Sequence, residues 1–235
     1  MGTFAPYVVA HESSVVKINE DIPLRYAALV GCGVTTGVGS AITTGKVKPG
    51  DIVAVVGVGG IGMNAVQGAR LAGAGMIVVI DPNAWKRNRA YEFGATHDAA
   101  SMAEAKEMIS DISWGAMANA VIMTPGVVEG SMMADALALV GKNGRIVVTG
   151  LASAYETEVT MSLLDLTLYQ KSVHGSLFGS ANPRADIPRL LSWYQRGDLK
   201  LDELVTKTYT LDEINQGYAD MRDGANVRGM IVYDT

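Results

Sequence analysis

Cysteine is almost absent from this sequence: Cys32 is the only one among 235 residues. A single thiol cannot form an internal disulfide, and a single thiolate cannot complete a zinc site built from several thiolates. Cysteine-based cross-links are therefore excluded within the chain. Such sparse cysteine use is typical of a reducing compartment, so we expect a soluble protein in the cytoplasm.

Long apolar runs, basic clusters and aromatic arrays are also missing. We find no apolar run of 18 residues, and no basic segment followed by an apolar stretch at the start of the chain. The 19 basic residues are spread along the sequence, and the formal net charge is −5. Aromatic residues make up 6% and form no array that could stack bases. These absences predict neither a nucleic-acid nor a membrane partner.

Glycine and aliphatic residues are abundant instead, with 27 glycines and a hydrophobic share of 49%. From about residue 48, short β-branched runs alternate with longer segments of helical periodicity. Each short run is continuously apolar, as strands buried on both faces are. The runs are residues 52–56, 76–80, 120–123 and 145–149.

Helical spacing covers residues 61–72, 84–93 and 131–140, and Gly94 and Gly141 follow two of these segments as typical helix ends. Alternating strands and helices predict an α/β fold, with a doubly wound parallel sheet covered on both faces. We expect this Rossmann domain over residues 34–178.

The two ends of the chain do not continue this alternation. After residue 150 we expect an α+β pattern, with helices and strands in irregular order. The expected helices are 163–169, 187–196 and 211–222, and the expected strands are 204–209 and 230–233. The first 33 residues contain two short strand-like pieces, 7–10 and 15–18, which cannot bury a core alone. We therefore expect residues 1–33 and 179–235 to pack together as partial remnants of another domain.

A glycine-rich turn links the first expected strand to the first helix. Gly57, Gly59 and Gly62 have the spacing G-x-G-x-x-G, and Asp81 follows 19 residues after the last of them. In a βαβ unit these glycines permit a tight turn, close approach of a pyrophosphate, and packing of the helix against the sheet. Asp81 at the end of the next strand would accept hydrogen bonds from a ribose and repel a 2′-phosphate, which favours NAD over NADP.

Several alternatives stay open at this turn. The glycines could form a turn in a nucleotide-free protein, and Asp81 could merely cap the helix after Pro82. Lys86 could reach the same ribose, or it could belong to a solvated helix face with Arg87.

Several segments together resemble the zinc-dependent medium-chain alcohol dehydrogenases, and the resemblance extends along the whole chain. They are residues 31–41 (GCGVTTGVGSA), 47–51 (VKPGD), 57–62 (GVGGIG), 93–96 (FGAT), 175–179 (GSLFG) and 226–229 (NVRG). The turn region and residues 182–188 look most like the nitrosodimethylaniline-dependent (nicotinoprotein) branch found in actinobacteria.

The resemblance implies an oxidoreductase that converts a small-molecule alcohol to an aldehyde or ketone, with hydride transfer to the nicotinamide and zinc polarising the alkoxide. It implies that Cys32 is a zinc ligand. It also implies a set of residues that contact the dinucleotide: Thr36, Gly57, Gly59, Gly60, Ile61, Gly62, Asp81, Lys86, Leu177, Phe178 and Arg228. By the same resemblance, residues 171–177 are an edge strand in a homodimer or homotetramer.

The sequence also departs from the family. Family members carry a long additional amino-terminal segment with the second catalytic cysteine, the Gly-His-Glu histidine, the proton-relay hydroxyl and the structural zinc loop. His11, His97 and His174 have no close metal-type spacing with Cys32. We therefore expect no catalytic residue and no bound zinc in this polypeptide alone, which makes it the NAD-binding portion of a truncated alcohol dehydrogenase. The alternatives are a zinc-free NAD-binding sensor or assembly subunit, and a chain that binds no dinucleotide.

Overall fold

The computed structural model describes residues 4–233. The chain divides into two compact units: Cys32–Ala181 forms the larger one, and the residues up to Gly31 join those from Asn182 onward in the smaller one. The domain boundaries expected from the sequence, after residues 33 and 178, lie within three residues of this division. Each unit is described by itself below.

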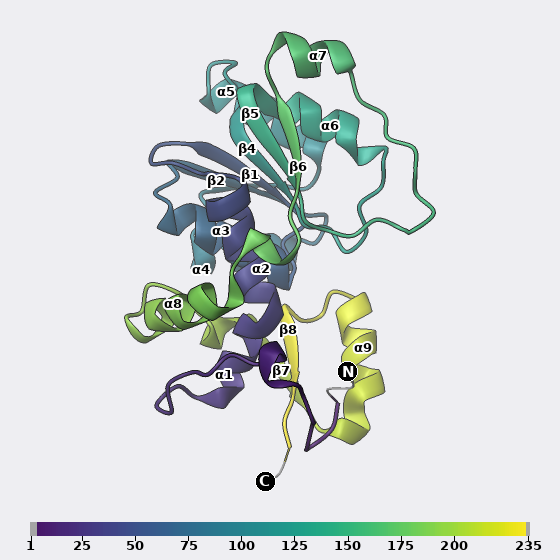
Figure 1. The fold of residues 1–235 in the computed structure, drawn as a ribbon. Coiled ribbons are helices and arrows are strands. Elements are labelled where there is room, and N and C mark those ends of the chain that lie inside the picture. Colours follow the sequence, from purple (N-terminus) through teal and green to yellow (C-terminus); the bar gives the residue numbers. More distant parts are fainter. Residues whose placement is uncertain (1–3, 234–235) are drawn as a thin grey trace. The chain divides into compact units, whose positions relative to one another are not determined.

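The larger unit contains a six-stranded parallel sheet with the order β3-β2-β1-β4-β5-β6, drawn in Figure 1. The strands are β1 (Ile52–Val56), β2 (Met76–Ile80), β3 (His97–Ala99), β4 (Ala118–Met123), β5 (Val140–Val148) and β6 (Ser172–Gly175). The chain order reverses between β1 and β4, as in the dinucleotide-binding doubly wound fold. The predicted α/β Rossmann fold is confirmed.

Helices cover both faces of this sheet. α5 (Met102–Ile112) and α6 (Met132–Leu139) pack on the face to which Ala54, Val56 and Val121 point. α3 (Gly60–Leu71) and α4 (Ala84–Phe93) contact β1, β2 and β3. Because both faces are covered, the central strands are almost wholly buried, which explains their continuous apolar sequences.

Local side-chain chemistry sets the ends of these helices. Asn83 accepts hydrogen bonds from the backbone N–H groups of Trp85 and Lys86 and so begins α4, while Gly94 ends it in a left-handed conformation (φ +115°). Ser101 caps α5 in the same way through the Glu104 N–H. The three-residue strand β3 and helix α5 were not predicted, because this segment lacks a continuous apolar run.

A continuous helical stretch, Leu24–Thr44, precedes the sheet and was also missed. It includes α1 (Leu24–Leu29), a π-helical turn Val30–Val34, α2 (Thr35–Gly39) and a second π-helical turn, Ser40–Thr44. Within residues 4–233 this stretch is the one helix long and apolar enough to cross a membrane by length and composition, with a mean hydropathy of 1.3, although 56% of the apolar window is buried. Because Arg25 and several threonines interrupt this stretch, it does not contradict the expectation of no continuous apolar run of 18 residues, and the core helices of other proteins share its features.

The smaller unit contains, besides α1, two longer helices and a second sheet. They are α8 (Pro183–Gln195), α9 (Ile214–Arg222) and the two parallel strands β7 (Val205–Tyr209) and β8 (Arg228–Ile231). These elements confirm the expected α+β pattern, but α8 begins four residues earlier than predicted. Asn182 caps its first turn and Pro183 occupies the first helical position, where a missing N–H costs nothing. α7 (Leu163–Leu168), in the larger unit, matches its prediction closely.

The two strands predicted near the start of the chain are wrong. Residues 7–10 and 15–18 form no strand, and the only regular element between them is the short 3₁₀ helix Glu12–Ser14, capped by His11. Val9 is 97% exposed. Short apolar pieces alone do not form a strand, because the backbone groups of a strand need a hydrogen-bonded neighbour, and none pairs with these pieces in the described part of the chain.

Candidate dinucleotide-binding site

The glycine-rich turn lies at the carboxyl end of β1 and opens α3, as the sequence predicts. Gly57 has a left-handed backbone (φ +82°), and an added Cβ would lie 2.7 Å from the backbone N of Pro125. Its N–H donates to the Ile80 carbonyl at 2.7 Å. Only glycine fits this position, and the close packing directs the chain into the helix.

Gly59 presents an open backbone at the start of α3. It occupies the N-cap position without a side-chain cap, and an added Cβ would meet no protein atom within 4 Å. In the described part of the chain, the N–H groups of Gly60, Ile61 and Gly62 have no hydrogen-bond acceptor. The first turn of α3 therefore offers unpaired donors beside a surface with no side chain, which is the arrangement that binds phosphate groups.

Gly62 lies where α3 meets the ends of two strands of the sheet. An added Cβ would collide with the Gly57 carbonyl oxygen, directly after β1, and lie 2.9 Å from the Thr124 hydroxyl, directly after β4, so the glycine lets the helix lie close to the sheet, as expected. The Thr124 Oγ1 donates to the carbonyls of Val56 and Gly57 at 3.0 and 2.6 Å. Thr124 follows β4, 67 residues after the turn, so no local pattern could have revealed that it holds the turn in place.

Asp81 follows β2 and is only 7% exposed. Its Oδ2 accepts from the Val58 N–H at 3.0 Å, and its Oδ1 accepts from the Asn83 N–H at 2.9 Å. The alternative that Asp81 caps α4 is wrong, because Asn83 is the cap. The carboxylate is instead fixed beside the glycine turn, and each oxygen keeps capacity for a further hydrogen bond. Its contact with a ribose stays a prediction.

The two basic residues after Asp81 have different environments. Arg87 is held by the protein: its Nε donates to Asp98 at 2.6 Å and its Nη1 to the Asp81 carbonyl at 2.7 Å. Hydrogen bonds from Tyr91 and then Arg87 lower the pKa of Asp98. The solvated helix face suggested as an alternative therefore does not include Arg87. Lys86 is half-buried, and its ammonium makes no ion pair among residues 4–233, so its contact with a ribose stays a prediction.

Three other predicted contact residues lie close together in the larger unit. Thr36 is buried in α2, Leu177 is 85% exposed, and Phe178 has a left-handed backbone (φ +53°). Gly179 brings this loop against α2, since an added Cβ would lie 2.8 Å from the Gly39 Cα. The fold therefore brings residues of α2 and of the loop after β6 together, and their contact with a dinucleotide stays a prediction.

A chain of hydroxyl groups ties this loop to the helical stretch and was not predicted. Ser40 Oγ lies 2.9 Å from Thr149 Oγ1 and 3.1 Å from Ser176 Oγ, and Thr44 Oγ1 lies 3.0 Å from Ser176 Oγ and 2.9 Å from Ser180 Oγ. Its members are up to 136 residues apart in the sequence, so only the fold brings them together. The chain fixes both ends of the segment that carries Leu177 and Phe178.

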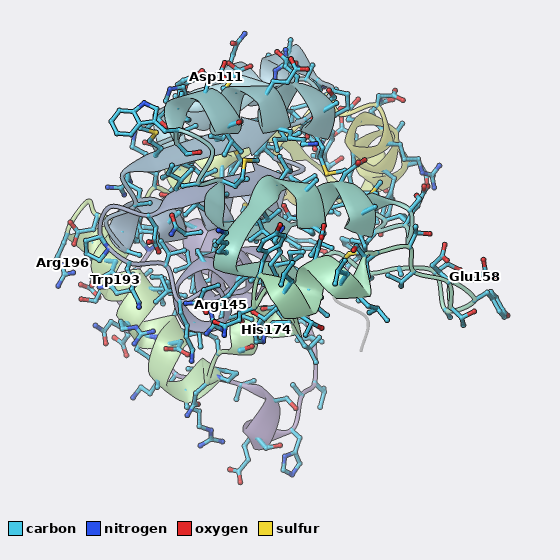
Figure 2. All side chains as sticks on the ribbon, turned by 90° about the horizontal axis from the view of Figure 1, so that it is seen from above. Asp111, Arg145, Glu158, His174, Trp193 and Arg196 are labelled. Atoms are coloured by element: carbon cyan, nitrogen blue, oxygen red, sulfur yellow. The ribbon has the colours of Figure 1, made fainter. Side chains whose placement is uncertain are left out.

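The predicted metal ligand and the histidines do not form a metal site. Cys32 is exposed in the π-helical turn Val30–Val34, and within the described range no three His, Cys, Asp or Glu side chains lie close enough to hold a metal ion. His174 Nε2 accepts from Arg145 Nη1 at 3.1 Å on the edge of the sheet, where Figure 2 labels both side chains. Arg228 lies in β8 of the smaller unit, and its predicted contact stays a prediction.

Comparisons with known proteins agree with this architecture. Residues 60–196 match the family model described as zinc-binding dehydrogenase. The chain is 49% identical to Alcohol dehydrogenase B of Mycobacterium tuberculosis over 233 residues and 49% identical to the NDMA-dependent alcohol dehydrogenase of Amycolatopsis methanolica. The crystal structure of benzyl alcohol dehydrogenase from Acinetobacter calcoaceticus is similar with a TM-score of 0.84 at 30% identity.

The coverage of these matches is unequal. The alignments to the two curated relatives include 99% of this chain but only 62% and 63% of those proteins. The benzyl alcohol dehydrogenase match includes 93% of this chain and 59% of that one. The chain therefore spans somewhat under two thirds of the length of the relatives it matches.

Proposed function

Because the chain belongs to the zinc-binding dehydrogenase family, we propose that its larger unit binds NAD as the cofactor-binding part of an alcohol dehydrogenase. One observation carries this proposal: three unpaired N–H groups open α3 beside the bare backbone of Gly59, and the Asp81 carboxylate is fixed next to them. The relatives named as alcohol dehydrogenases support the reaction class, and NAD fits the residues present.

The chemistry of this crevice matches the two halves of the adenosine diphosphate group. The N–H groups of Gly60, Ile61 and Gly62, together with the dipole of α3, favour a pyrophosphate by about 0.3 to 2 kcal/mol. Gly57 and Gly59 let the backbone approach it. Asp81 accepts hydrogen bonds from the ribose hydroxyls, and Lys86, five residues further along the chain in the first turn of α4, reaches the same sugar.

Asp81 also supports a preference for NAD over NADP. Its carboxylate would face the 2′-phosphate of NADP, and two like charges 4 Å apart cost about 1 kcal/mol in water and about 4 kcal/mol at an effective dielectric constant near 20. This range corresponds to roughly 5-fold to 1000-fold in affinity.

Three further proposed contacts with the dinucleotide lie in the same unit. Thr36 contacts it from α2, and Leu177 and Phe178 contact it from the loop that the hydroxyl chain holds, while the contact of Arg228, in β8 of the smaller unit, stays a prediction. When bound, NAD supplies the hydride acceptor. The residues of this chain bind and orient the cofactor, and they include no group that we assign to proton transfer.

Zinc does not fit the described residues in the same way, since three protein ligands are needed and no such group is present there. We propose Cys32 as one ligand in a longer protein that carries the others, and we derive no step through the metal. The substrate of such a protein is a small-molecule alcohol.

A titration with NADH tests the binding proposal. We expect saturable NADH binding by this chain, measured by the fluorescence of the nicotinamide, and a loss of about tenfold or more in affinity for Gly59→Ala, because the added methyl group occupies the path of the pyrophosphate. Gly31→Ala is the matched control, because its added Cβ also meets no atom within 4 Å.

The outcomes separate the remaining alternatives. Equal affinity in both glycine variants would contradict the assigned crevice, and absent binding in the unmodified chain would favour a protein that binds no dinucleotide. Tight NAD binding by the native, full cellular product without dehydrogenase activity would favour the sensor or assembly subunit.

We also propose that two copies associate through β6. This strand lies at the edge of the sheet, and its Val173 is 38% exposed, so its free backbone groups can pair with a second copy. Light scattering of the unmodified chain should give twice the monomer mass. Val173→Lys should give the monomer mass, because a charge on an edge strand opposes pairing; an unchanged mass would contradict this interface.

A further inference from the structure

A cavity with polar side chains in its wall lies at the end of the six-stranded sheet opposite the glycine turn. It has a volume of about 260 Å³ and is bordered by residues 115–117, the start of β5, and Tyr169 with Lys171. These segments lead into β4, β5 and β6 at their amino ends. The glycine turn and Asp81 instead follow the carboxyl ends of β1 and β2, so the two sites share a sheet but no residue.

The polar side chains in the wall of this cavity are two lysines and a tyrosine. The Nζ atoms of Lys142 and Lys171 each lie 5.6 Å from the centre of the Tyr169 ring. Lys171 Nζ also donates to the Leu137 carbonyl at 2.7 Å, which leaves two of its N–H groups for another acceptor. The two ammonium groups are thus gathered around one aromatic ring.

This pair of cations has no carboxylate partner in the wall. No Asp or Glu is among the described residues that line the cavity. Across residues 4–233, neither lysine forms an ion pair, and no residue accepts or donates a hydrogen bond to the Tyr169 hydroxyl. Burial lowers the pKa of Lys171, partly offset by Asp165. An anion in the cavity would therefore meet two positive charges and a free hydroxyl donor.

The loop that forms the opposite wall is held in a defined conformation. Trp114, Gly115 and Met117 all have left-handed backbones (φ +52°, +81° and +67°). The Ser113 hydroxyl accepts a hydrogen bond from the Met117 N–H at 2.9 Å, and the Trp114 N–H donates to the carbonyl of Asp111, which Figure 2 labels near the end of α5. Such unusual backbone conformations persist only where their surroundings fix them.

We propose that this cavity binds a small anion with a phosphate group, either inorganic phosphate or a small phosphate monoester. Lysine ammonium groups bind phosphate as point charges, and the Tyr169 hydroxyl adds a directed donor. The volume is somewhat below the roughly 300 to 1,000 Å³ of pockets that take drug-sized ligands, so a small anion matches it better than a whole dinucleotide.

Lysine labelling tests the site residue by residue. The chain is acetylated at constant ionic strength with increasing inorganic phosphate, and each lysine is quantified by mass spectrometry. At a phosphate concentration about ten times the Kd, labelling of Lys142 and Lys171 should slow about tenfold. Lys106, an exposed lysine of α5, should react at an unchanged rate. A parallel series with glycerol phosphate distinguishes a monoester from free phosphate, and acetate tests whether any anion suffices.

Two variants identify the groups responsible. Tyr169→Phe keeps the ring and removes the hydroxyl, and should weaken the protection of Lys171 by about fivefold, the effect of one hydrogen bond. Lys142→Gln should weaken it by about tenfold, whereas Lys106→Gln should leave it unchanged.

Protection of all lysines alike, equal protection by acetate, or no effect of either cavity variant would overturn the proposal. Because phosphate bound only at the glycine turn would leave Lys142 and Lys171 unprotected, failure of this proposal is distinguishable from failure of NAD binding.

Discussion

The two units of this chain hold their strands together by different means. In the larger unit, β1 and β4 lie between layers of helices, and Val55 and Ile122 are 0% exposed. In the smaller unit, β7 and β8 form a two-stranded sheet, and the ionised Asp220 of α9 accepts hydrogen bonds from Lys207 at 2.8 Å and Tyr209 at 2.6 Å. Apolar burial thus dominates around the first sheet, whereas a partly exposed ionic network supports the second. Mutations and pH should affect the two sheets differently.

The largest expected effect is a cavity in the larger sheet. Ile122→Ala should lower the free energy of unfolding of this unit by about 2 to 5 kcal/mol, because Ile122 is fully buried on a central strand. Val232 lies beside the smaller sheet and is 45% exposed. Val232→Ala should therefore change the free energy of unfolding of the smaller unit by less than about 0.5 kcal/mol. Urea unfolding followed by circular dichroism measures both. Similar losses in the two variants would contradict the contrast between the sheets.

The second prediction concerns the cofactor preference of the larger unit. Asp81→Asn removes the charge facing a 2′-phosphate, so the ratio of NADPH to NADH affinity should rise by about fivefold or more. Fluorescence titration with each cofactor gives this ratio. Asp98→Asn is a suitable control, because Asp98 pairs with Arg87 rather than with the glycine turn. An unchanged affinity ratio in Asp81→Asn would show that the Asp81 carboxylate does not set the preference between the two cofactors.

The smallest predicted effect is a pH dependence confined to the smaller unit. Hydrogen bonds from Lys207, Tyr209 and Gln216 lower the pKa of Asp220 to about 2 from its ordinary value of 3.8. A carboxyl whose folded pKa is lowered contributes stability above its unfolded pKa and loses it as the pH falls. The difference in free energy of unfolding between the unmodified chain and Asp220→Asn should therefore decrease as the pH falls from about 4 to about 2, the range between the ordinary and the lowered pKa of Asp220.

Trp193 of α8 can report on this unit. Its fluorescence is isolated by replacing Trp85 and Trp114 of the larger unit with phenylalanine, and urea unfolding is followed at each pH. A difference between the two proteins that stays constant over the whole range would show that Asp220 does not titrate as its contacts imply.

The same contrast explains what the sequence could reveal. The four apolar runs predicted strands correctly, since a strand covered on both faces leaves a continuous local signal. The strand prediction for residues 7–10 was wrong because these residues have a strand-like pattern but no neighbouring strand to pair with. Whether a neighbouring strand is present depends on the fold and not on the local sequence. The helical stretch Leu24–Thr44 was missed because its glycine-rich sequence argues against a helix, and only tertiary packing overrides that preference.

The candidate site was predictable to a similar extent. Gly57, Gly59 and Asp81 could be proposed from the sequence because they belong to a motif that is defined by local spacing around one turn. Thr124, which supports that turn, and the hydroxyl chain centred on Ser40 were not found, because they join residues tens to more than a hundred positions apart. Spacing motifs identify groups that face a ligand, whereas the groups that position them depend on the folded sheet.

A structure of the full chain crystallised with NAD tests the central proposal most directly. It should show the pyrophosphate within hydrogen-bond distance of the N–H groups of Gly60 and Ile61. The hydroxyl groups of the adenosine ribose should donate hydrogen bonds to the Asp81 carboxylate. A dinucleotide bound elsewhere, or an Asp81 carboxylate turned away from it, would contradict the assignment of this unit as the cofactor-binding part of an alcohol dehydrogenase.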